Sequence, residues 1–364
     1  MQIKDVIHHL EALAPTAYAE EFDNVGLLVG SPQTNLTGIL VTLDTLENIV
    51  DEAIEKNCNL IVSFHPIVFK GLKRFTGATY VERTVMKAIK HDIAIYAIHT
   101  ALDNSVVGVN DMMCEQLGLS NRKILIPQNG TIKKLTTYVP VSEYNFVLEK
   151  LFEAGAGSIG NYENCSFSSK GIGTFKPQEN ANPSIGKIGE THHEEEMQLQ
   201  VTFPKHNQKL ILQALFNAHS YEEVAYEIIT LENKNQHIGI GMIGELTKPI
   251  DELTFLKKVK ETFKTGCVRH SKLRNQPVQK VAVLGGSGSF AIPNAISAGA
   301  DVFITADLKY HQFYEAENKI IIADIGHYES EQYTKKLILT YLRKKISNFA
   351  IILADNKTNP IQYL

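Results

Sequence analysis

The sequence predicts an α/β protein in which two flanks of similar build form one domain around an inserted α+β domain. Short apolar runs alternate with helical patterns near both ends of the chain, whereas paired strand patterns dominate the middle. Alternating strands and helices are typical of parallel sheets, and a split βαβ order is typical of ferredoxin-like domains. The length of 364 residues supports this division, because it exceeds what one ordinary core accommodates.

The first flank opens with a helix, because Ile3, Val6, Ile7, Leu10 and Leu13 recur at helical spacing. The next predicted elements are a strand at about 38–43, a helix at about 47–56, a strand at 60–64, a helix at 80–90 and a strand at 93–98. The strands are continuously apolar, which is typical of parallel strands covered on both faces. Two of these strands therefore deliver the residues that follow them to one edge of a sheet.

The middle of the chain predicts a separate domain with a different pattern. The predicted elements are, in order, a strand at about 135–139, a helix at about 144–153, strands at about 164–170 and 197–203, a helix at about 209–218 and a strand at about 224–230. Residues 177–189 are rich in Pro, Asn and Gly and predict an exposed loop. We therefore expect residues 129–240 to form a ferredoxin-like insertion between the segments 1–128 and 241–364.

The last flank returns to alternating strands and helices. Strands are predicted at 281–284, 302–305, 320–323 and 350–353, and helices at 290–298 and 331–345. Both flanks thus share one architecture, and we expect them to pack together into one domain.

Composition indicates a globular protein and excludes several classes. Hydrophobic residues make up 44% and charged residues 21% of the chain, and the net charge is −4 with a pI near 6.4. This charge disfavours nucleic-acid binding by bulk electrostatics. The four cysteines form no CxxC pair, and neither a signal peptide nor a membrane-length apolar run is present. We therefore expect a cytoplasmic protein without a membrane partner.

Three distant segments place metal-ligand residue types after apolar runs. They are Ser63-Phe64-His65-Pro66, His99-Thr100-Ala101-Leu102-Asp103 and His327-Tyr328-Glu329-Ser330-Glu331. Histidine and carboxylate bind zinc, iron and manganese. Because open α/β sheets gather their working residues beyond the strand C-termini, these segments predict a hydrolytic metal centre.

Each segment alone also has a structural interpretation. His327 and Glu331 are spaced to share one face at a helix start, where a carboxylate also stabilises the helix dipole. The pair His99 and Asp103 is expected on a loop, where Asp103 is equally suited to a turn. His65 alone is more often structural at a strand end. The metal hypothesis depends on all three segments converging.

A glycine-rich turn, Gly285-Gly286-Ser287-Gly288-Ser289, joins a predicted strand to a predicted helix. Such turns cradle phosphate with backbone amides, so Gly285, Gly286 and Gly288 are candidate ligand-binding residues. The segment also satisfies a dinucleotide-binding pattern, with Asp307 near the position of its ribose-binding acid. A tight packing turn is an equally good interpretation. Asp307 and His311 are candidates either to support the metal ligands or to act as acid/base residues.

Several motifs together resemble the Nif-three-like proteins, also described as GTP cyclohydrolase 1 type 2 homologues. The matching pieces are Phe22-Asp23-Asn24-Val25-Gly26-Leu27, His65-Pro66-Ile67-Val68-Phe69, His99-Thr100-Ala101-Leu102-Asp103, Thr305-Ala306-Asp307-Leu308-Lys309-Tyr310-His311 and Gly326-His327-Tyr328-Glu329-Ser330-Glu331. The middle domain resembles the PII- and CutA-like insertion of longer bacterial members. The pieces carrying that match are residues 154–162 and 219–226.

The resemblance implies a site for two divalent metal ions, with ligand roles for His65, Asp103, His327 and Glu331. It also implies a toroidal homohexamer with the sites facing an inner cavity. One departure stands out, because the family commonly has two adjacent histidines where this chain has Phe64 and His65. Phenylalanine cannot coordinate a metal, so either one ion is bound more weakly or His99 substitutes.

The expected function is that of a metal-dependent hydrolase acting on a nucleotide or related phosphorylated compound, as in GTP ring opening. Zinc is the expected metal, with iron and manganese as alternatives. His99 or His311 is the acid/base candidate. The alternative is a non-enzymatic metal carrier or inserter, or a regulator whose PII-like domain senses a small ligand.

Overall fold

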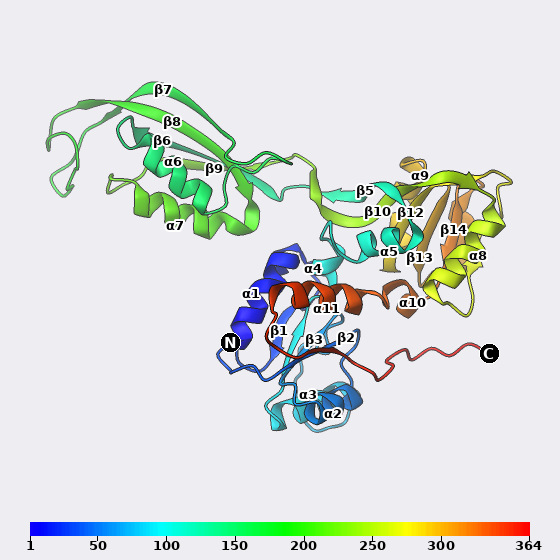
Figure 1. The fold of residues 1–364 in the computed structure, drawn as a ribbon. Helices are drawn as coiled ribbons and strands as arrows, with labels where there is room; N and C mark the ends of the chain where they lie inside the picture. The colour runs from blue at the N-terminus through cyan, green and yellow to red at the C-terminus, as the bar shows by residue number, and fades with distance from the viewer. The chain divides into compact units, whose positions relative to one another are not determined.

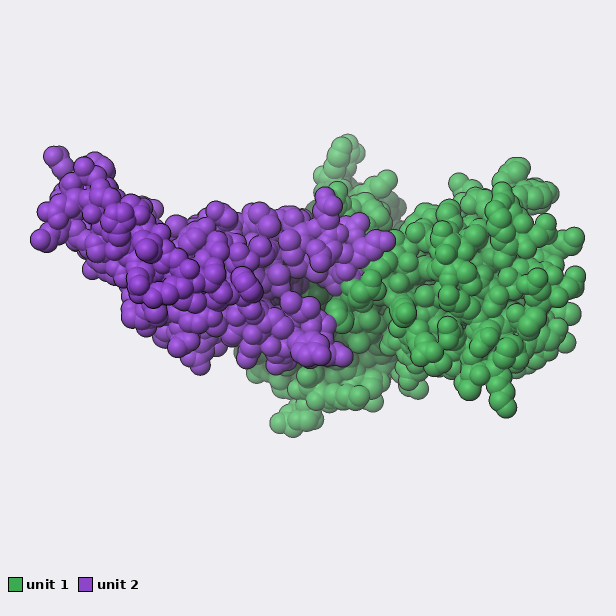
Figure 2. All heavy atoms as spheres, turned by 90° about the horizontal axis from the view of Figure 1, so that it is seen from above, with its two compact units in different colours: residues 1–127, 236–364 green, residues 128–235 purple.

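Residues 1–364 are described by a computed structural model, and they divide into two units (Figure 2). Unit 1 contains residues 1–127 and 236–364, and unit 2 contains residues 128–235. The chain leaves unit 1 once and returns to it once, which is the organisation of an inserted domain. No helix is both long enough and apolar enough to cross a membrane.

Unit 1 holds two sheets, of which the first has the strand order β1-β4-β3-β2-β15. Its strands are β1 (Gly26–Val29), β2 (Ile39–Thr42), β3 (Leu60–Ser63), β4 (Ala94–Ala97) and β15 (Ile351–Leu353). All neighbouring pairs are parallel except β1 with β4. The sequence placed residues 350–353 in the last flank, but β15 pairs with β2 and so completes the sheet of the first flank.

Helices cover both faces of this first sheet (Figure 1). They are α1 (Ile3–Leu13) and α11 (Thr334–Lys345) on one face, and α2 (Glu47–Glu55) and α3 (Tyr80–Lys90) on the other. Alternate residues of each strand face opposite sides, so Leu40 packs toward α2 while Ile39 and Val41 pack toward α1. Burial on both faces explains why these strands read as uninterrupted apolar runs.

The second sheet of unit 1 has the order β11-β14-β13-β12-β10-β5. Its strands are β5 (Ser120–Gln128), β10 (Asn235–Ile250), β11 (Arg269–His270), β12 (Val278–Ser287), β13 (Val302–Ala306) and β14 (Ile321–Asp324). The predicted strands β12, β13 and β14 form its parallel centre. The sequence patterns did not predict β5 or β10, which lie next to the insertion.

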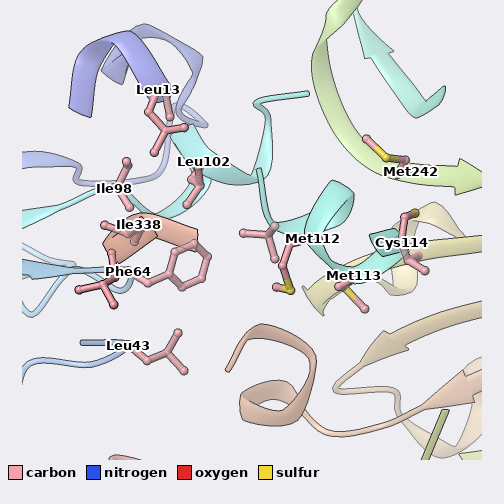
Figure 3. Packing of buried hydrophobic residues seen from close by; sticks show 14 of the residues in the cluster. Leu13, Leu43, Phe64, Ile98, Leu102, Met112, Met113, Cys114, Met242 and Ile338 are labelled. Atoms are coloured by element: carbon pink, nitrogen blue, oxygen red, sulfur yellow. The ribbon is translucent and has the colours of Figure 1, made fainter. Parts of the chain in front are cut away.

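Further helices flank the second sheet. One face packs against α5 (Val109–Leu117) and α8 (Glu252–Phe263), and the other packs against η3 (Ser289–Ala291) and α9 (Ile292–Ser297). One buried cluster continues from the first sheet through α5 to the second, and Phe64, Leu102, Met112 and Met113 belong to it (Figure 3). A continuous close-packed core fixes the two sheets relative to each other within unit 1.

Unit 2 has the element order β6 (Ile132–Pro140), α6 (Tyr144–Glu153), β7 (Ser166–Phe175), β8 (His192–Pro204), α7 (Gln208–Ala218) and β9 (Tyr226–Leu231). Its sheet has the order β7-β8-β6-β9, and every pair is antiparallel. Residues of α6 and α7 share one apolar cluster with β6 and β8. Likeness of this unit to PII and CutA proteins stays a prediction.

Three local expectations differ from the structure. Residues 99–103 form a short helix, α4 (His99–Asp103), instead of a loop. The helix expected over 331–345 is α11 preceded by a separate turn of helix, α10 (His327–Glu331). The helix expected over 290–298 begins as the 3-10 turn η3. The break between α10 and α11 matters, because α10 contacts the second sheet and α11 the first.

Candidate metal centre

The candidate metal centre is built from residues that follow parallel strands of both sheets of unit 1. His65 follows β3, α4 follows β4 and α10 follows β14. β3 and β4 are parallel neighbours in the first sheet, and β13 and β14 are parallel neighbours in the second. The carboxyl ends of parallel strands are where α/β sheets bind their ligands.

Three side chains from the two ends of the chain converge at this point. One ligand atom from each of His65, His327 and Glu331 lies within 4.8 Å of the other two. The Oε2 atom of Glu331 is 3.1 Å from Nε2 of His65 and 3.2 Å from Nε2 of His327. The structure therefore brings together three of the four residues to which the family resemblance assigns a ligand role.

Two buried polar atoms of this group lack a hydrogen-bond partner. Neither His65 Nε2 nor Glu331 Oε2 has a hydrogen-bond partner, because their close approach lacks hydrogen-bond alignment. The Glu331 side chain is only 3% exposed, so water does not solvate its charge. The Glu331 charge faces the two histidine rings, and buried charges are ordinarily paired or coordinate metals. Two imidazole nitrogens and a carboxylate oxygen match the ligands of zinc, iron or manganese.

Each histidine of the centre is held by an aspartate through its other ring nitrogen. The Nδ1 atom of His65 is 2.8 Å from Asp44 Oδ1, and the Nδ1 atom of His327 is 2.7 Å from Asp307 Oδ2. An ionised carboxylate only accepts hydrogen bonds, so the imidazole Nδ1 is the donor in both pairs. This arrangement leaves Nε2 of each ring facing Glu331.

The charges of the group are strongly coupled. Burial by itself would lower the pKa of His65, but the neighbouring Asp44 and Glu331 carboxylates outweigh it and raise that pKa to about 9. Burial likewise opposes the charge of His327, whose pKa Asp307 and Glu331 raise to about 11. For Glu331, the two histidines overcome burial and lower the pKa to about 2. The pocket thus stabilises a carboxylate among positive charges.

Asp103, the fourth expected ligand, lies on α4 and is buried. Its Oδ1 atom has no hydrogen-bond partner, but its carboxylate does not join the group of three. Burial and the nearby Glu331 charge raise the pKa of Asp103 well above its usual value. Asp103 therefore adds an unsatisfied carboxylate beside the centre.

His99, one of the two expected acid/base residues, lies beside the centre on α4. Its ring centroid is 5.2 Å from that of His65, and its Nδ1 atom is 2.9 Å from the Asp23 carboxylate. The buried side chain of Phe64 meets the His99 ring edge-on, with a centroid distance of 5.5 Å. Phe64 thus fills space next to the centre with an apolar ring.

His311, the other expected acid/base residue, is not brought to the centre. It lies exposed on η4 (Tyr310–Ala316), and its ring contacts are with Tyr310 and Tyr314. The sequence made Asp307 and His311 candidates either to support the metal ligands or to act as acid/base residues. Asp307 adopts φ of 58°, lies outside any helix and bonds to His327 Nδ1.

The glycine-rich turn packs against the centre and offers no free phosphate cradle at its first two residues. The Gly285 amide donates to Asn110 Oδ1 at 3.0 Å, and the Gly286 amide donates to Ser330 Oγ at 2.9 Å. A Cβ atom on Gly286 would lie 2.5 Å from Oε1 of Glu331. A Cβ atom on Gly288 would clash with Thr305. Gly285 and Gly286 therefore pack against the centre, and phosphate binding by the turn stays a prediction.

The rival dinucleotide hypothesis, which assigned Asp307 to a ribose, stays a prediction. The Oδ2 atom of Asp307 accepts hydrogen bonds from His327 Nδ1 and Ser287 Oγ, which ties this side chain to the centre. Sequence reasoning missed Asp44 as a site residue and noticed Asp23 only within a family motif. One available signal was the position of Asp44, which follows the apolar strand β2 as His65 follows β3.

The similarity of this chain to known proteins, in sequence and in fold, extends over nearly its whole length. A family model described as Duf34/NIF3 (NGG1p interacting factor 3) matches residues 1–360. A GTP cyclohydrolase 1 type 2 homolog of Bacillus subtilis (strain 168) is 39% identical, with 99% of this chain and 98% of the relative covered.

Two solved structures agree with this match. A Bacillus cereus protein related to NIF3 has a TM-score of 0.87 and 36% identity, with 100% of this chain and 99% of that chain covered. A Staphylococcus aureus protein has a TM-score of 0.79 and 30% identity, with the same coverage. The chain therefore belongs to the Duf34/NIF3 family.

Proposed function

We propose that the chain is a metal-dependent hydrolase that acts on a nucleotide or a related phosphorylated compound. The observation that carries the proposal is the convergence of His65, His327 and Glu331 around unsatisfied buried atoms. The name of the Bacillus subtilis relative makes GTP the first substrate to test. Zinc is the proposed metal, with iron and manganese as alternatives.

The residues of the chain divide between holding the metal and moving protons. His65, His327 and Glu331 would hold a divalent cation, and Asp103 supplies a further carboxylate beside them. A bound divalent cation supplies Lewis acidity and lowers the pKa of water toward neutrality. His99 is the proposed acid/base residue, because Asp23 fixes its Nδ1 atom and its ring lies against that of His65.

Two cations per chain are proposed, bound with unequal affinity. The group of three provides two nitrogens and one oxygen for the first ion. A second ion would find no histidine ligand at the buried position of Phe64, so Asp103 is the ligand proposed for it, while His99 keeps its proposed acid/base role. The variant Phe64→His tests this asymmetry. A rise in bound metal per chain by elemental analysis supports it, and unchanged stoichiometry argues against it.

A homohexamer is proposed on the family resemblance, with a small molecule as the ligand of a PII/CutA-like unit 2. Light scattering coupled to size exclusion tests the assembly directly. A mass near six times the 40.6 kDa chain is expected. A monomer or dimer would contradict it.

The decisive experiment combines elemental analysis with a substrate screen. The protein is purified without chelators and its zinc, iron and manganese are quantified. It is then incubated with GTP, other nucleotides and phosphoesters, with Glu331→Gln as the inactive variant and Glu329→Gln as the matched control on α10. Turnover that Glu331→Gln abolishes supports a hydrolase. Stoichiometric metal that transfers to an apo-acceptor without any turnover supports a carrier instead.

A further inference from the structure

We propose that Asp44 and Asp307 are positioning residues that fix His65 and His327 as Nε2 ligands and thereby set the affinity of the centre for its cation. The inference rests on the metal site of the proposed function. It goes further, because neither aspartate belongs to the group of three ligand residues. The two aspartates come from different sheets, since Asp44 follows β2 and Asp307 follows β13.

Asp44 is anchored on both of its carboxylate oxygens. Its Oδ1 atom accepts from His65 Nδ1 at 2.8 Å, and its Oδ2 atom accepts from Thr358 Oγ1 at 2.6 Å. Thr358 is buried and lies 314 residues away along the chain. The last segment of the chain therefore holds the carboxylate that holds the His65 ring.

Asp307 likewise holds the ring of its histidine, His327, but does so from an unusual backbone conformation. Its φ of 58° is in the left-handed region, which residues other than glycine seldom occupy. Such backbone strain persists where the surrounding contacts over-determine a position, and it concentrates at functional sites. Here those contacts are hydrogen bonds from Ser287 Oγ and from His327 Nδ1 to the same Oδ2 atom.

The hydrogen bonds to the two aspartates determine which ring nitrogen of each histidine is free to bind a metal. An imidazole that donates its Nδ1 proton to a carboxylate presents the Nε2 lone pair to a metal, and the carboxylate also raises the basicity of that lone pair. Both Nε2 atoms lie near Glu331 Oε2, at 3.1 and 3.2 Å. The two aspartates thus aim nitrogens from opposite sheets at one point.

Asp23 and His99 provide an internal comparison with the same bond. His99 Nδ1 is 2.9 Å from the Asp23 carboxylate, which also accepts from the Thr100 amide at 3.1 Å. His99 is nevertheless absent from the group of three ligand residues. If an aspartate affects metal binding by orienting a histidine ligand, the substitution of Asp23 should affect binding of the first cation far less than the substitution of Asp44 or Asp307.

The test compares the full-length variants Asp44→Asn, Asp307→Asn and Asp23→Asn. The dissociation constant for Zn²⁺ is measured by competition with a chromophoric chelator. We expect Asp44→Asn and Asp307→Asn each to weaken binding about 10- to 100-fold, the range typical of outer-shell partners of metal-bound histidine. Asp23→Asn is expected to change first-ion affinity less than about threefold. Wild-type affinity in both Asp44→Asn and Asp307→Asn would overturn the inference.

A second readout separates positioning from general destabilisation. The visible absorption of bound Co²⁺ reports the ligand field, and thermal unfolding of the metal-free variants reports their stability. We expect altered Co²⁺ spectra in Asp44→Asn and Asp307→Asn and a smaller loss of affinity in Thr358→Val, which keeps Asp44 but removes its anchor. Unaltered Co²⁺ spectra with lowered unfolding temperatures would indicate a structural role only and overturn the inference. If the wild-type protein binds neither cation, the proposed function fails as well.

Discussion

Buried polar residues behave differently in the two units of the chain. In unit 2, Glu196 on β8 accepts from the Tyr221 hydroxyl at 2.9 Å, and His219 bonds to the Tyr138 carbonyl at 2.9 Å and to the Tyr221 amide at 3.1 Å. In unit 1, Glu331 is buried and His65 is partly buried, and each has a buried facing atom without a hydrogen-bond partner.

The difference separates structural groups from groups suited to a ligand. Buried polar groups in folded proteins are nearly always hydrogen-bonded, so an unsatisfied one calls for an explanation. A single unsatisfied atom is weak support, since Glu329 Oε2 is also without a partner. At the metal centre, however, unsatisfied atoms from both ends of the chain converge within 4.8 Å. We therefore take convergence, rather than burial alone, as the criterion for a metal site.

The largest expected effect is on metal binding by Glu331→Gln. The substitution keeps the shape of the side chain but removes the charge that lies between His65 and His327. We expect Zn²⁺ affinity to fall more than about 100-fold, beyond the effect typical of outer-shell residues. Isothermal titration calorimetry measures it. The matched variant Glu329→Gln, on the same helix α10, is expected to retain affinity, and equal losses in both variants would show that convergence is not the criterion.

The next effect is on stability when metal is added. A ligand that binds only the folded state at 100 times its dissociation constant stabilises that state by about 2.7 kcal/mol. We expect the unfolding temperature of chelator-treated protein to rise with added Zn²⁺ and to fall again when chelator is restored. Glu331→Gln should show no rise at the same Zn²⁺ concentration. A comparable rise in that variant would place the binding site elsewhere.

Glu52 provides a contrasting buried carboxylate within unit 1, because its oxygens are fully partnered. Lys56 Nζ donates to it at 2.6 Å, and the backbone amides of Asp355 and Asn356 donate at 2.7 and 3.1 Å. Removing the charge in Glu52→Gln leaves these donors poorly paired. We expect a loss of about 2 kcal/mol in the free energy of unfolding, without a change in Zn²⁺ affinity.

The same carboxylate makes the stability of unit 1 depend on pH. Burial opposes the charge of Glu52, but Lys56 and the two amides outweigh it and lower the pKa from 4.5 to about 2. A depressed pKa in the folded state contributes stability above the unfolded value, so the contribution is present above about pH 4.5 and is lost as the pH falls toward 2. Denaturant titrations across this range should show a smaller pH effect in Glu52→Gln than in the wild-type protein.

The smallest expected effect is in unit 2. Tyr221→Phe removes the hydroxyl that donates to Glu196, and loss of one such bond costs about 1 kcal/mol. Hydrogen exchange of the amides of β6 and β8 measures this locally, and we expect faster exchange there with unchanged Zn²⁺ affinity. A loss of metal affinity in this variant would contradict the assignment of the centre to unit 1 alone.

Local patterns predicted the strands that are buried on both faces and the helices with clear spacing of apolar residues. The strands β2, β3 and β4 and the helix α3 agree closely with expectation, because continuous apolar runs and helical spacing survive in the sequence itself. The strand β1 was missed because two of its four residues are only half-buried, whereas β2, β3 and β4 are buried throughout. The strands β5 and β10 were missed because their polar and apolar residues follow no clear period.

The candidate site also has features that the sequence indicated and features that it did not. Strand ends followed by histidine and carboxylate are visible in the sequence, and they indicated His65, His327 and Glu331. The pattern could not indicate that His311 lies exposed beside Tyr310 or that the Gly285 and Gly286 amides are already bonded. Those facts depend on neighbours such as Asn110 and Ser330, which are remote in the sequence.

The sequence by itself determined which residue types stand at the ends of which strands, because strand and helix periodicities are local properties. Tertiary structure decided that β15 completes the first sheet and that α10 ends before α11 crosses back toward it. It also decided that Asp44 and Asp307, from different sheets, turn the Nε2 atoms of two histidines toward one carboxylate. Hydrogen bonds between remote segments have no sequence period, so only packing of the folded core specifies them.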